Sequence, residues 1–315
     1  MPDAGPPPGP APLPAPEGTQ LARARRLRET LIAWSLALPA TLLLLAFIFL
    51  PATAVIVLSV TDWQFGMRSF RFVGLANFAE VAADPGFWQS FRNTAFYCAI
   101  VVPGAVGLGL AVALAIEGGR SLRAFYRAAH FLPVMATLSA MAMAWEALLH
   151  PTVGLVNQAL RDLGFAGANW LRDEATVLPT LAMIGIWQNL GYAAVLFLAG
   201  LKAIPSDLYE AAAVDGADGW LDRLRTVTLP MLGPVMMFVT VIVAIRALQV
   251  FDTVAILTKG GPGKSSETLL YTLYTESFEY LRTGYGAAVT VVFLCIVMLL
   301  TLLQARAFDR RVHYQ

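Results

Sequence analysis

Residues 176–200, together with the segment that follows them, decide the fold of this chain. They read TVLPTLAMIGIWQNLGYAAVLFLAG and contain no charged residue. A helix that crosses a bilayer needs about twenty mostly apolar residues. Because unpaired backbone groups are costly in hydrocarbon, only helices and closed barrels span membranes. This run therefore predicts a membrane-spanning helix.

The next segment, residues 201–220, predicts a short surface helix rather than a second span. It reads LKAIPSDLYEAAAVDGADGW, and Pro205 separates it from the apolar run. Asp207 is expected to cap this helix with Glu210 three residues later, and Gly216 is expected to end it. The alanines between them would let another backbone approach closely.

Apolar and basic residues follow this helix together. Trp220 and Leu221 lie close to Arg223 and Arg225 in the sequence, which is the pattern of a helix that lies in a groove of a partner protein. The alternative is an interfacial loop, in which Glu210 only caps its helix and Trp220 marks the level of the lipid headgroups.

Five more apolar segments resemble residues 176–200, so the sequence predicts six spans and an all-α, multi-pass membrane protein. The composition agrees, because 57% of the 315 residues are hydrophobic and only 14% are charged, whereas soluble domains carry about a quarter charged residues. The first span is overlong and is expected to tilt or kink at its prolines. The five segments lie near 31–60, 92–117, 123–149, 228–250 and 285–308.

The distribution of Lys and Arg predicts the orientation, because positive charge is retained on the cytoplasmic side of a membrane. With the N-terminus inside, thirteen of these residues fall on the cytoplasmic side and seven in the outer loops. Both termini are therefore expected in the cytoplasm. Three sizeable outer loops result, near 61–91, 150–175 and 251–284.

Several classes of function are disfavoured by the sequence. The net charge of +1 and the lack of a basic cluster interleaved with aromatics give no sign of a nucleic-acid partner. An intramembrane enzyme would need facing catalytic or metal-binding groups, yet His130, His150 and His313 are far apart in the sequence. Cys98 and Cys295 lack a metal or redox spacing. No G-x-x-x-x-G-K-[S/T] loop is present to cradle a nucleotide.

The segment after residue 200 closely resembles the "EAA" loop of binding-protein-dependent importer permeases. The resemblance is carried by Glu-Ala-Ala at 210–212, Asp-Gly-Ala at 215–217 and Leu-Pro at 229–230. In that family the loop is a coupling helix docked in a cleft of the ATP-hydrolysing subunit. The residues implied to couple this chain to an ATPase are Glu210, Ala211, Ala212, Asp215, Gly216, Ala217 and Trp220.

Further pieces of the carbohydrate-uptake branch of this family occur in order along the chain. One departure is visible: Gly216 and Pro230 are fourteen positions apart where the family pattern has thirteen, so one additional residue is expected between Gly219 and Arg225. The pieces are Phe72-Val73-Gly74-Leu75, Asn77-Phe78, Asn93-Thr94, Phe131-Leu132-Pro133, Gly154-Leu155-Val156-Asn157, Trp170-Leu171, Ala199-Gly200-Leu201, Ile204-Pro205, Gln249-Val250-Phe251-Asp252, Gly260-Gly261-Pro262, Glu267-Thr268 and Gly284-Tyr285.

The resemblance implies the type I fold of ABC importer transmembrane domains, in the bacterial cytoplasmic (inner) membrane. Residues 1–30 would be a disordered, then basic, cytoplasmic tail, and residues 31–315 the permease domain with its coupling loop at 202–230. The implied partners are a second permease subunit that completes a heterodimer, two ATP-binding subunits, an extracytoplasmic solute-binding protein and membrane lipid. No cofactor is expected in this chain, because the partner subunits would bind ATP and Mg.

Candidate substrate contacts are polar side chains within the spans, where such groups line a wet cavity or find a partner. Gln188, Asn189 and Tyr192 of the fourth span lie at the level where the related maltose permease contacts its sugar, and Gln249 lies at the end of the fifth. Amides and an aromatic ring suit a di- or oligosaccharide. Hydrogen bonding between helices is the alternative.

Arg246 of the fifth span is expected to form a structural ion pair with Glu146 of the third span. Its alternative role is to bind an anionic substrate, and the C-terminal Arg310-Arg311-Val312-His313-Tyr314-Gln315 resembles glycerol-3-phosphate permeases. The alternatives to a carbohydrate importer are therefore a glycerol-3-phosphate or polyol importer and a secondary carrier. A carrier would leave the Glu-Ala-Ala segment unexplained.

Overall fold

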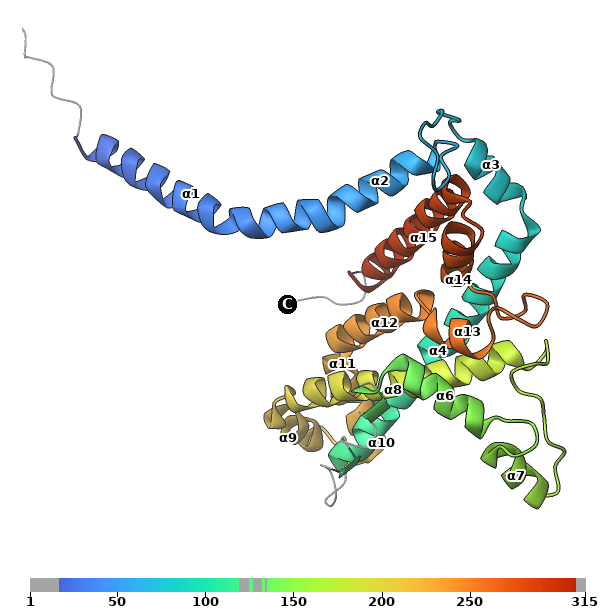
Figure 1. Ribbon diagram of the computed structural model, residues 1–315. Coiled ribbons are helices and arrows are strands. Elements are labelled where there is room, and N and C mark those ends of the chain that lie inside the picture. The colour runs from blue at the N-terminus through green and yellow to red at the C-terminus, as the bar shows by residue number, and fades with distance from the viewer. Residues whose placement is uncertain (1–16, 119–124, 127–131, 134, 310–315) are drawn as a thin grey trace, which may run out of the picture. The chain divides into compact units, whose positions relative to one another are not determined.

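The computed structural model describes residues 17–118, 125–126, 132–133 and 135–309 (Figure 1). These residues are mostly helical, and the one bridge of extended backbone among them joins Thr61 to Phe72. The prediction of an all-α membrane protein is confirmed. The chain divides into two units, residues 1–55 and 56–315.

The described part of the first unit is helical. It consists of α1 (Glu17–Leu44), a π-helical turn η1 (Leu45–Phe49) and the start of α2 (Leu50–Ser59), within which the second unit begins. Pro51 lacks a backbone N–H and its ring crowds the carbonyl four residues earlier, which explains a widened turn directly before it. α1 begins at Glu17, inside the segment expected to be a tail, so the helix is longer than predicted. Residues 1–16 lie outside the described part of the chain.

Five helical segments in the described residues are long and apolar enough to cross a membrane. They are Arg28–Ser59, Pro85–Gly118, Val177–Lys202, Gly233–Leu257 and Thr283–Arg306. The predicted span at 123–149 lies partly outside the described residues. Its described end is α6 (Leu138–Leu148), which Thr137 caps by accepting a hydrogen bond from the Ala140 N–H.

Three helices form the centre of the second unit: α4 (Pro85–Gly118), α8 (Val177–Lys202) and α12 (Gly233–Leu248). α4 and α8 approach closely because small residues line their contact; a Cβ added to Gly109 would lie 2.7 Å from the Ala193 Cβ. Phe197 and Val239 are fully buried in the same cluster. α15 (Thr283–Asp309) packs against α12 and against the short helix α3 (Ala76–Ala83).

Charged side chains connect α3 and the residue after it to the start of α15 and to the turn before α15. Arg282 donates a 3.0 Å hydrogen bond to Glu276 of the turn η3 (Thr275–Glu279) and forms a second ion pair with Glu80 of α3. The Tyr285 hydroxyl donates a 2.6 Å hydrogen bond to Asp84, between α3 and α4. This network links α3 and α4 to η3 and α15.

The loop at 150–175 is organised by one buried amide. Asn157 of α7 (Leu155–Asp162) is fully buried, accepts hydrogen bonds from Ala168 N–H and Trp170 Nε1–H, and donates to the Ala168 carbonyl. Because one buried side chain bonds three groups of Ala168 and Trp170, eleven and thirteen residues further along the chain, it closes the loop.

Candidate functional site

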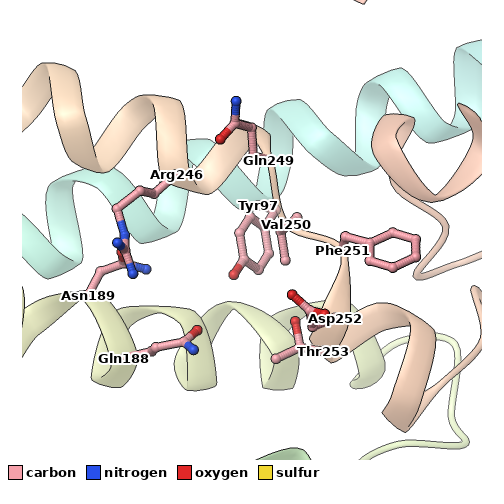
Figure 2. Close-up of a pocket in the computed structure, with 9 residues that line it drawn as sticks. All are labelled: Tyr97, Gln188, Asn189, Arg246, Gln249, Val250, Phe251, Asp252 and Thr253. Carbon is pink, nitrogen blue, oxygen red and sulfur yellow. The ribbon is translucent and has the colours of Figure 1, made fainter. Parts of the chain in front are cut away.

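A pocket of about 240 Å³ lies among α4, α8 and α12 (Figure 2). Gln188 and Asn189 lie twelve and thirteen residues into α8, a helix of 26 residues, so they sit close to its midpoint. The pocket therefore lies beside the middle of α8. Its lining is Tyr97, Gln188, Asn189, Arg246, Gln249, Val250, Phe251, Asp252 and Thr253.

A break in the fifth span opens this pocket. The sequence predicts a span over 228–250, but α12 ends at Leu248 and a separate helix, α13 (Asp252–Leu257), begins after three residues. Irregular backbone at membrane depth is tolerated where it is buried in protein or lines a water-filled cavity. Here the Val250 carbonyl accepts a 3.2 Å hydrogen bond from Thr268 Oγ1, and residues 249–251 line the pocket.

Arg246 is held by an amide and an aromatic ring. Its Nε donates a 2.9 Å hydrogen bond to Asn189 Oδ1, and its guanidinium lies 5.1 Å from the centre of the Tyr192 ring. The expected ion pair with Glu146 is wrong: both residues are described, and no ion pair joins them. α6, which carries Glu146, packs against α13, and Glu146 is exposed.

The four predicted substrate contacts occupy different positions. Gln188 and Asn189 line the pocket; Asn189 is buried and its Nδ2 donates to the Gly185 carbonyl at 2.8 Å, so both ends of its amide are engaged. Gln249 also lines the pocket, but its amide points away from Gln188 and Asn189 in Figure 2. Tyr192 lies outside the lining, beneath Arg246.

Sequence reasoning missed Tyr97, Asp252 and Thr253. Tyr97 is a single aromatic residue in an apolar run, so no pattern marks it. Its hydroxyl fits because Gly185 of the facing helix has no side chain; a Cβ there would collide with the Tyr97 oxygen. Asp252 could have been found, because a carboxylate next to an apolar span is costly unless it lines a wet cavity or is paired.

The predicted coupling segment forms α9 (Ser206–Val214), and Gly216 ends it as expected. Gly216 has φ +90, its N–H donates to the Ala213 carbonyl and the Ala217 N–H donates to the Ala212 carbonyl. These two bonds form a Schellman motif, which satisfies the last carbonyls of the helix.

The expected cap at Asp207 is wrong. The capping position is Pro205, without a side-chain hydrogen bond, because the helix begins two residues earlier than predicted. Asp207 therefore lies in the first turn, where a carboxylate still interacts favourably with the helix dipole.

One contact joins α9 to the chain that follows it, and a second joins the turn after α9 to the same part of the chain. The Tyr209 hydroxyl lies 3.1 Å from Thr228 Oγ1, and Arg223 Nε donates a 3.1 Å hydrogen bond to the Ala217 carbonyl. Arg223 ends α10 (Trp220–Arg223), and a π-helical turn, η2 (Leu224–Thr228), follows directly. A π-helical turn holds one more residue than an α-helical turn, and η2 overlaps the end of the segment where the additional residue was expected.

The outer surface of this segment is partly apolar. Val214 is 89% exposed, Trp220 69% and Leu221 46%, and Glu210 and Asp215 are exposed beside them. Ala212 and Ala217 are half-buried. The segment thus presents apolar anchors and acidic side chains that the described part of the chain does not cover.

No group of three or more His, Cys, Asp or Glu side chains that could hold a metal ion occurs in the described residues.

Comparison with known proteins gives consistent matches over most of the chain. The model of the family "Binding-protein-dependent transport system inner membrane component" matches residues 104–314. The probable ABC transporter permease protein YurN of Bacillus subtilis is 34% identical over 286 residues, which cover 89% of this chain and 97% of the relative.

Two relatives from Agrobacterium fabrum have names that specify a cargo. The sn-glycerol-3-phosphate transport system permease protein UgpA is 34% identical, with 90% of this chain and 97% of the relative covered. The sulfoquinovosyl glycerol transport system permease protein SmoG is also 34% identical, with 89% and 91% covered.

Among solved structures, a chain of a bacterial ABC transporter that imports the acidic polysaccharide alginate matches with a TM-score of 0.81. The identity is 20%, and 93% of this chain and 100% of that chain are covered. At this identity the match concerns the fold.

Proposed function

Since this chain belongs to the family of binding-protein-dependent transport system inner membrane components, it is a membrane-spanning permease subunit of an ABC importer, and we propose that its cargo is a carbohydrate. The observation that carries this proposal is the polar pocket beside the middle of α8. It combines an amide (Gln188), a carboxylate (Asp252) and two hydroxyls (Tyr97 and Thr253) beside the Phe251 ring.

This lining suits a polyhydroxylated cargo. Sugar hydroxyls are both donors and acceptors, and amides and hydroxyls can satisfy either role. Small-molecule sites combine apolar or aromatic walls with a few precisely placed polar groups. The cargo names of the relatives, sulfoquinovosyl glycerol and glycerol-3-phosphate, and the alginate importer of the same fold support a cargo of this chemical class.

Energy for transport would come from partner subunits. We place α9 and its neighbours Asp215, Gly216, Ala217 and Trp220 in a cleft of an ATP-binding subunit, with Glu210, Ala211 and Ala212 in the docked helix. Two such subunits would bind ATP and Mg, a second permease would complete the membrane pore, and an extracytoplasmic binding protein would deliver the cargo. ATP can shift the equilibrium between two conformations of the transporter only as far as its affinity for the two conformations differs. If the coupling segment did not contact the ATP-binding subunit, ATP hydrolysis would therefore not drive transport.

The proposed setting is the bacterial inner membrane, with both termini in the cytoplasm. Residues 1–30 would then be a cytoplasmic tail and 31–315 the permease domain. The coupling segment lies between α8 and α12 in the chain. The segment at 203–232 therefore precedes α12 and the segment at 249–284 follows it, so the two lie at opposite ends of this helix. The second of these would face the outside.

An anionic cargo is the second candidate, and one observation favours it. The Arg246 guanidinium has five N–H donors, of which Nε–H is used by Asn189, and no ion pair of Arg246 with a carboxylate occurs among the described residues. A cation at this depth that lines a cavity is a natural partner for a phosphate or sulfonate.

Uptake by the reconstituted complex, with its binding protein, distinguishes the two cargo classes. The cargoes are maltose, maltotriose, cellobiose, sulfoquinovosyl glycerol and glycerol-3-phosphate, tested on the unmodified chain and Arg246→Gln. A carbohydrate importer moves at least one neutral sugar, and Arg246→Gln retains that uptake. Uptake of glycerol-3-phosphate alone, lost in Arg246→Gln, would replace the carbohydrate proposal with the anionic one.

A further inference from the structure

A second cavity, of about 650 Å³, adjoins the pocket that Gln188 and Arg246 line, which we call the inner pocket. α14 (Leu269–Tyr274), η3 and the loop at 258–267 supply most of its wall. Phe251 lines both cavities, and in Figure 2 its ring points away from the Arg246 end of the inner pocket. The two cavities are therefore neighbours that share one aromatic side chain. We call the second one the outer cavity.

A row of aromatic rings runs along the outer cavity. The Tyr274 ring lies 5.1 Å from Phe251, 6.3 Å from Tyr271 and 5.7 Å from Phe278, measured between ring centres. Tyr271, Tyr274 and Phe278 are three and four residues apart, which places them on one helical face. Tyr274 is thus the centre of the row.

Only one end of the aromatic row is packed into a core. Tyr271 belongs to a buried cluster against which Phe251 packs, whereas Tyr274 is 36% exposed and Tyr280, another residue that lines the cavity, is 62% exposed. Exposed aromatic rings around a hollow are typical of a binding site, because they offer apolar faces and polar tips at a small cost in conformational entropy.

The charged groups of the outer cavity balance one another. The lining contains two lysines, Lys259 and Lys264, and two glutamates, Glu267 and Glu279. Lys264 pairs with the buried Glu267 at 3.6 Å, and Glu267 also accepts a 2.9 Å hydrogen bond from Thr272. Because the lysines and glutamates are equal in number, the cavity has no preference for an anion and suits a neutral, hydroxylated ligand.

We propose that the outer cavity is a second carbohydrate subsite, in which Tyr274 stacks on a sugar ring that then passes Phe251 to reach the inner pocket. The volume of about 650 Å³ falls within the roughly 300–1,000 Å³ of small-molecule sites, while the inner pocket is smaller. An oligosaccharide could occupy both cavities at once. This subsite rests on the proposed carbohydrate cargo and deepens it.

Thiol labelling of the assembled complex in proteoliposomes tests the subsite directly. Tyr280→Cys and Phe278→Cys are each made with Cys98 and Cys295 replaced by alanine, so that Tyr274 stays in place, and an impermeant maleimide is added outside. Tyr280 lines the cavity and is 62% exposed; the matched control is Phe278, which is 69% exposed but does not line the cavity. The probes are maltose, maltotriose, cellobiose and cellotriose, without binding protein.

The subsite predicts that one of these sugars slows the labelling of Tyr280→Cys about threefold at twice its Kd, where two thirds of the sites are occupied. Labelling of Phe278→Cys keeps its rate. If no sugar slows the labelling of Tyr280→Cys, the subsite does not exist. If sugars slow neither variant but empty binding protein slows both, the aromatic row is a protein-docking surface and the proposal is overturned.

A transport measurement separates this proposal from the proposed function. In complexes that import a sugar, Tyr274→Ala should lower uptake about tenfold at limiting substrate, the loss expected for a stacked ring, and Tyr274→Phe should restore it. Unchanged uptake in Tyr274→Ala overturns the subsite while the importer function stands. Failure of the unmodified complex to import any sugar overturns the carbohydrate cargo, whereas labelling reports on the subsite independently.

Discussion

Arg246 of α12 and Asn189 of α8 are joined by a 2.9 Å hydrogen bond from the guanidinium Nε to the amide oxygen. The bond crosses between two helices at the depth of the inner pocket, and Asn189 is itself anchored to the Gly185 carbonyl at 2.8 Å. The amide therefore positions Arg246, which in turn lies against Tyr192. The sequence offered two roles for Asn189, contact with the cargo and hydrogen bonding between helices. The bond that its amide oxygen accepts from Arg246 is of the second kind.

Removing this bond should destabilise the pair of helices. Asn189→Leu keeps the volume but leaves the Arg246 Nε–H without its acceptor, and interhelical hydrogen bonds in membranes contribute about 0.6 kcal/mol on average, up to about 1.7. A double-mutant cycle with Arg246→Leu, read from the free energy of unfolding in detergent, should give a coupling energy in this range. Additive effects of the two substitutions would contradict the bond.

Gly185→Ala should disturb the inner pocket, because the new methyl group would collide with the Tyr97 hydroxyl. Overpacking of this kind costs about 1–3 kcal/mol, so both thermal stability and sugar uptake should fall. Gly107→Ala is the matched control, since a Cβ at Gly107 meets nothing within 4 Å. Equal stability of the two variants would contradict the close contact.

Tyr209→Phe should loosen the coupling helix without unfolding the protein. The substitution removes the hydroxyl that lies 3.1 Å from Thr228 Oγ1, and a hydrogen bond of this kind contributes about 0.5–1.5 kcal/mol. Amide hydrogen exchange in α9 should become faster, while exchange in α8 stays unchanged. Ser206→Ala, at the exposed start of α9, is the control and should leave both rates as they are.

Acid should weaken the link between α3–α4 and α15. Burial raises the pKa of Asp84, but hydrogen bonds from the Tyr285 hydroxyl and the Gly86 N–H outweigh it, so the pKa lies below 3.8. A carboxyl with a lowered folded-state pKa stabilises the fold above its unfolded pKa and loses that contribution as the pH falls through the folded value. The stability difference between the unmodified chain and Asp84→Asn should persist from pH 7 to pH 5 and shrink below pH 3.8. A difference independent of pH would contradict the role of the carboxylate.

The sequence predicted the features that depend on local pattern. Apolar runs located the spans, and Gly216 marked the end of α9, because a left-handed residue there favours glycine. Gln188 and Asn189 stood out because amides are rare in apolar helices. These are properties that a residue and its neighbours determine.

Features that depend on helix rotation and tertiary contact were missed or wrong. The ion pair between Arg246 and Glu146 was predicted from their opposite charges alone. The charges do not determine how each helix is rotated, and this rotation decides which side chains meet. Tyr97 lines the pocket because its hydroxyl fits against Gly185, a residue far away in the sequence. The break after Leu248 depends on Thr268, which binds the Val250 carbonyl from the following segment.

Sugar-stimulated ATP hydrolysis by the reconstituted complex, with Glu210→Lys beside the unmodified chain, tests the coupling of this permease to an ATPase most directly. Glu29→Lys is the control, because it makes the same charge change on the predicted cytoplasmic side at a side chain that is 62% exposed. We expect sugar and binding protein to stimulate the unmodified chain and Glu29→Lys alike, and Glu210→Lys to lose the stimulation by about fivefold or more. Full stimulation in Glu210→Lys, or sugar uptake with no ATPase bound, would contradict the proposed coupling.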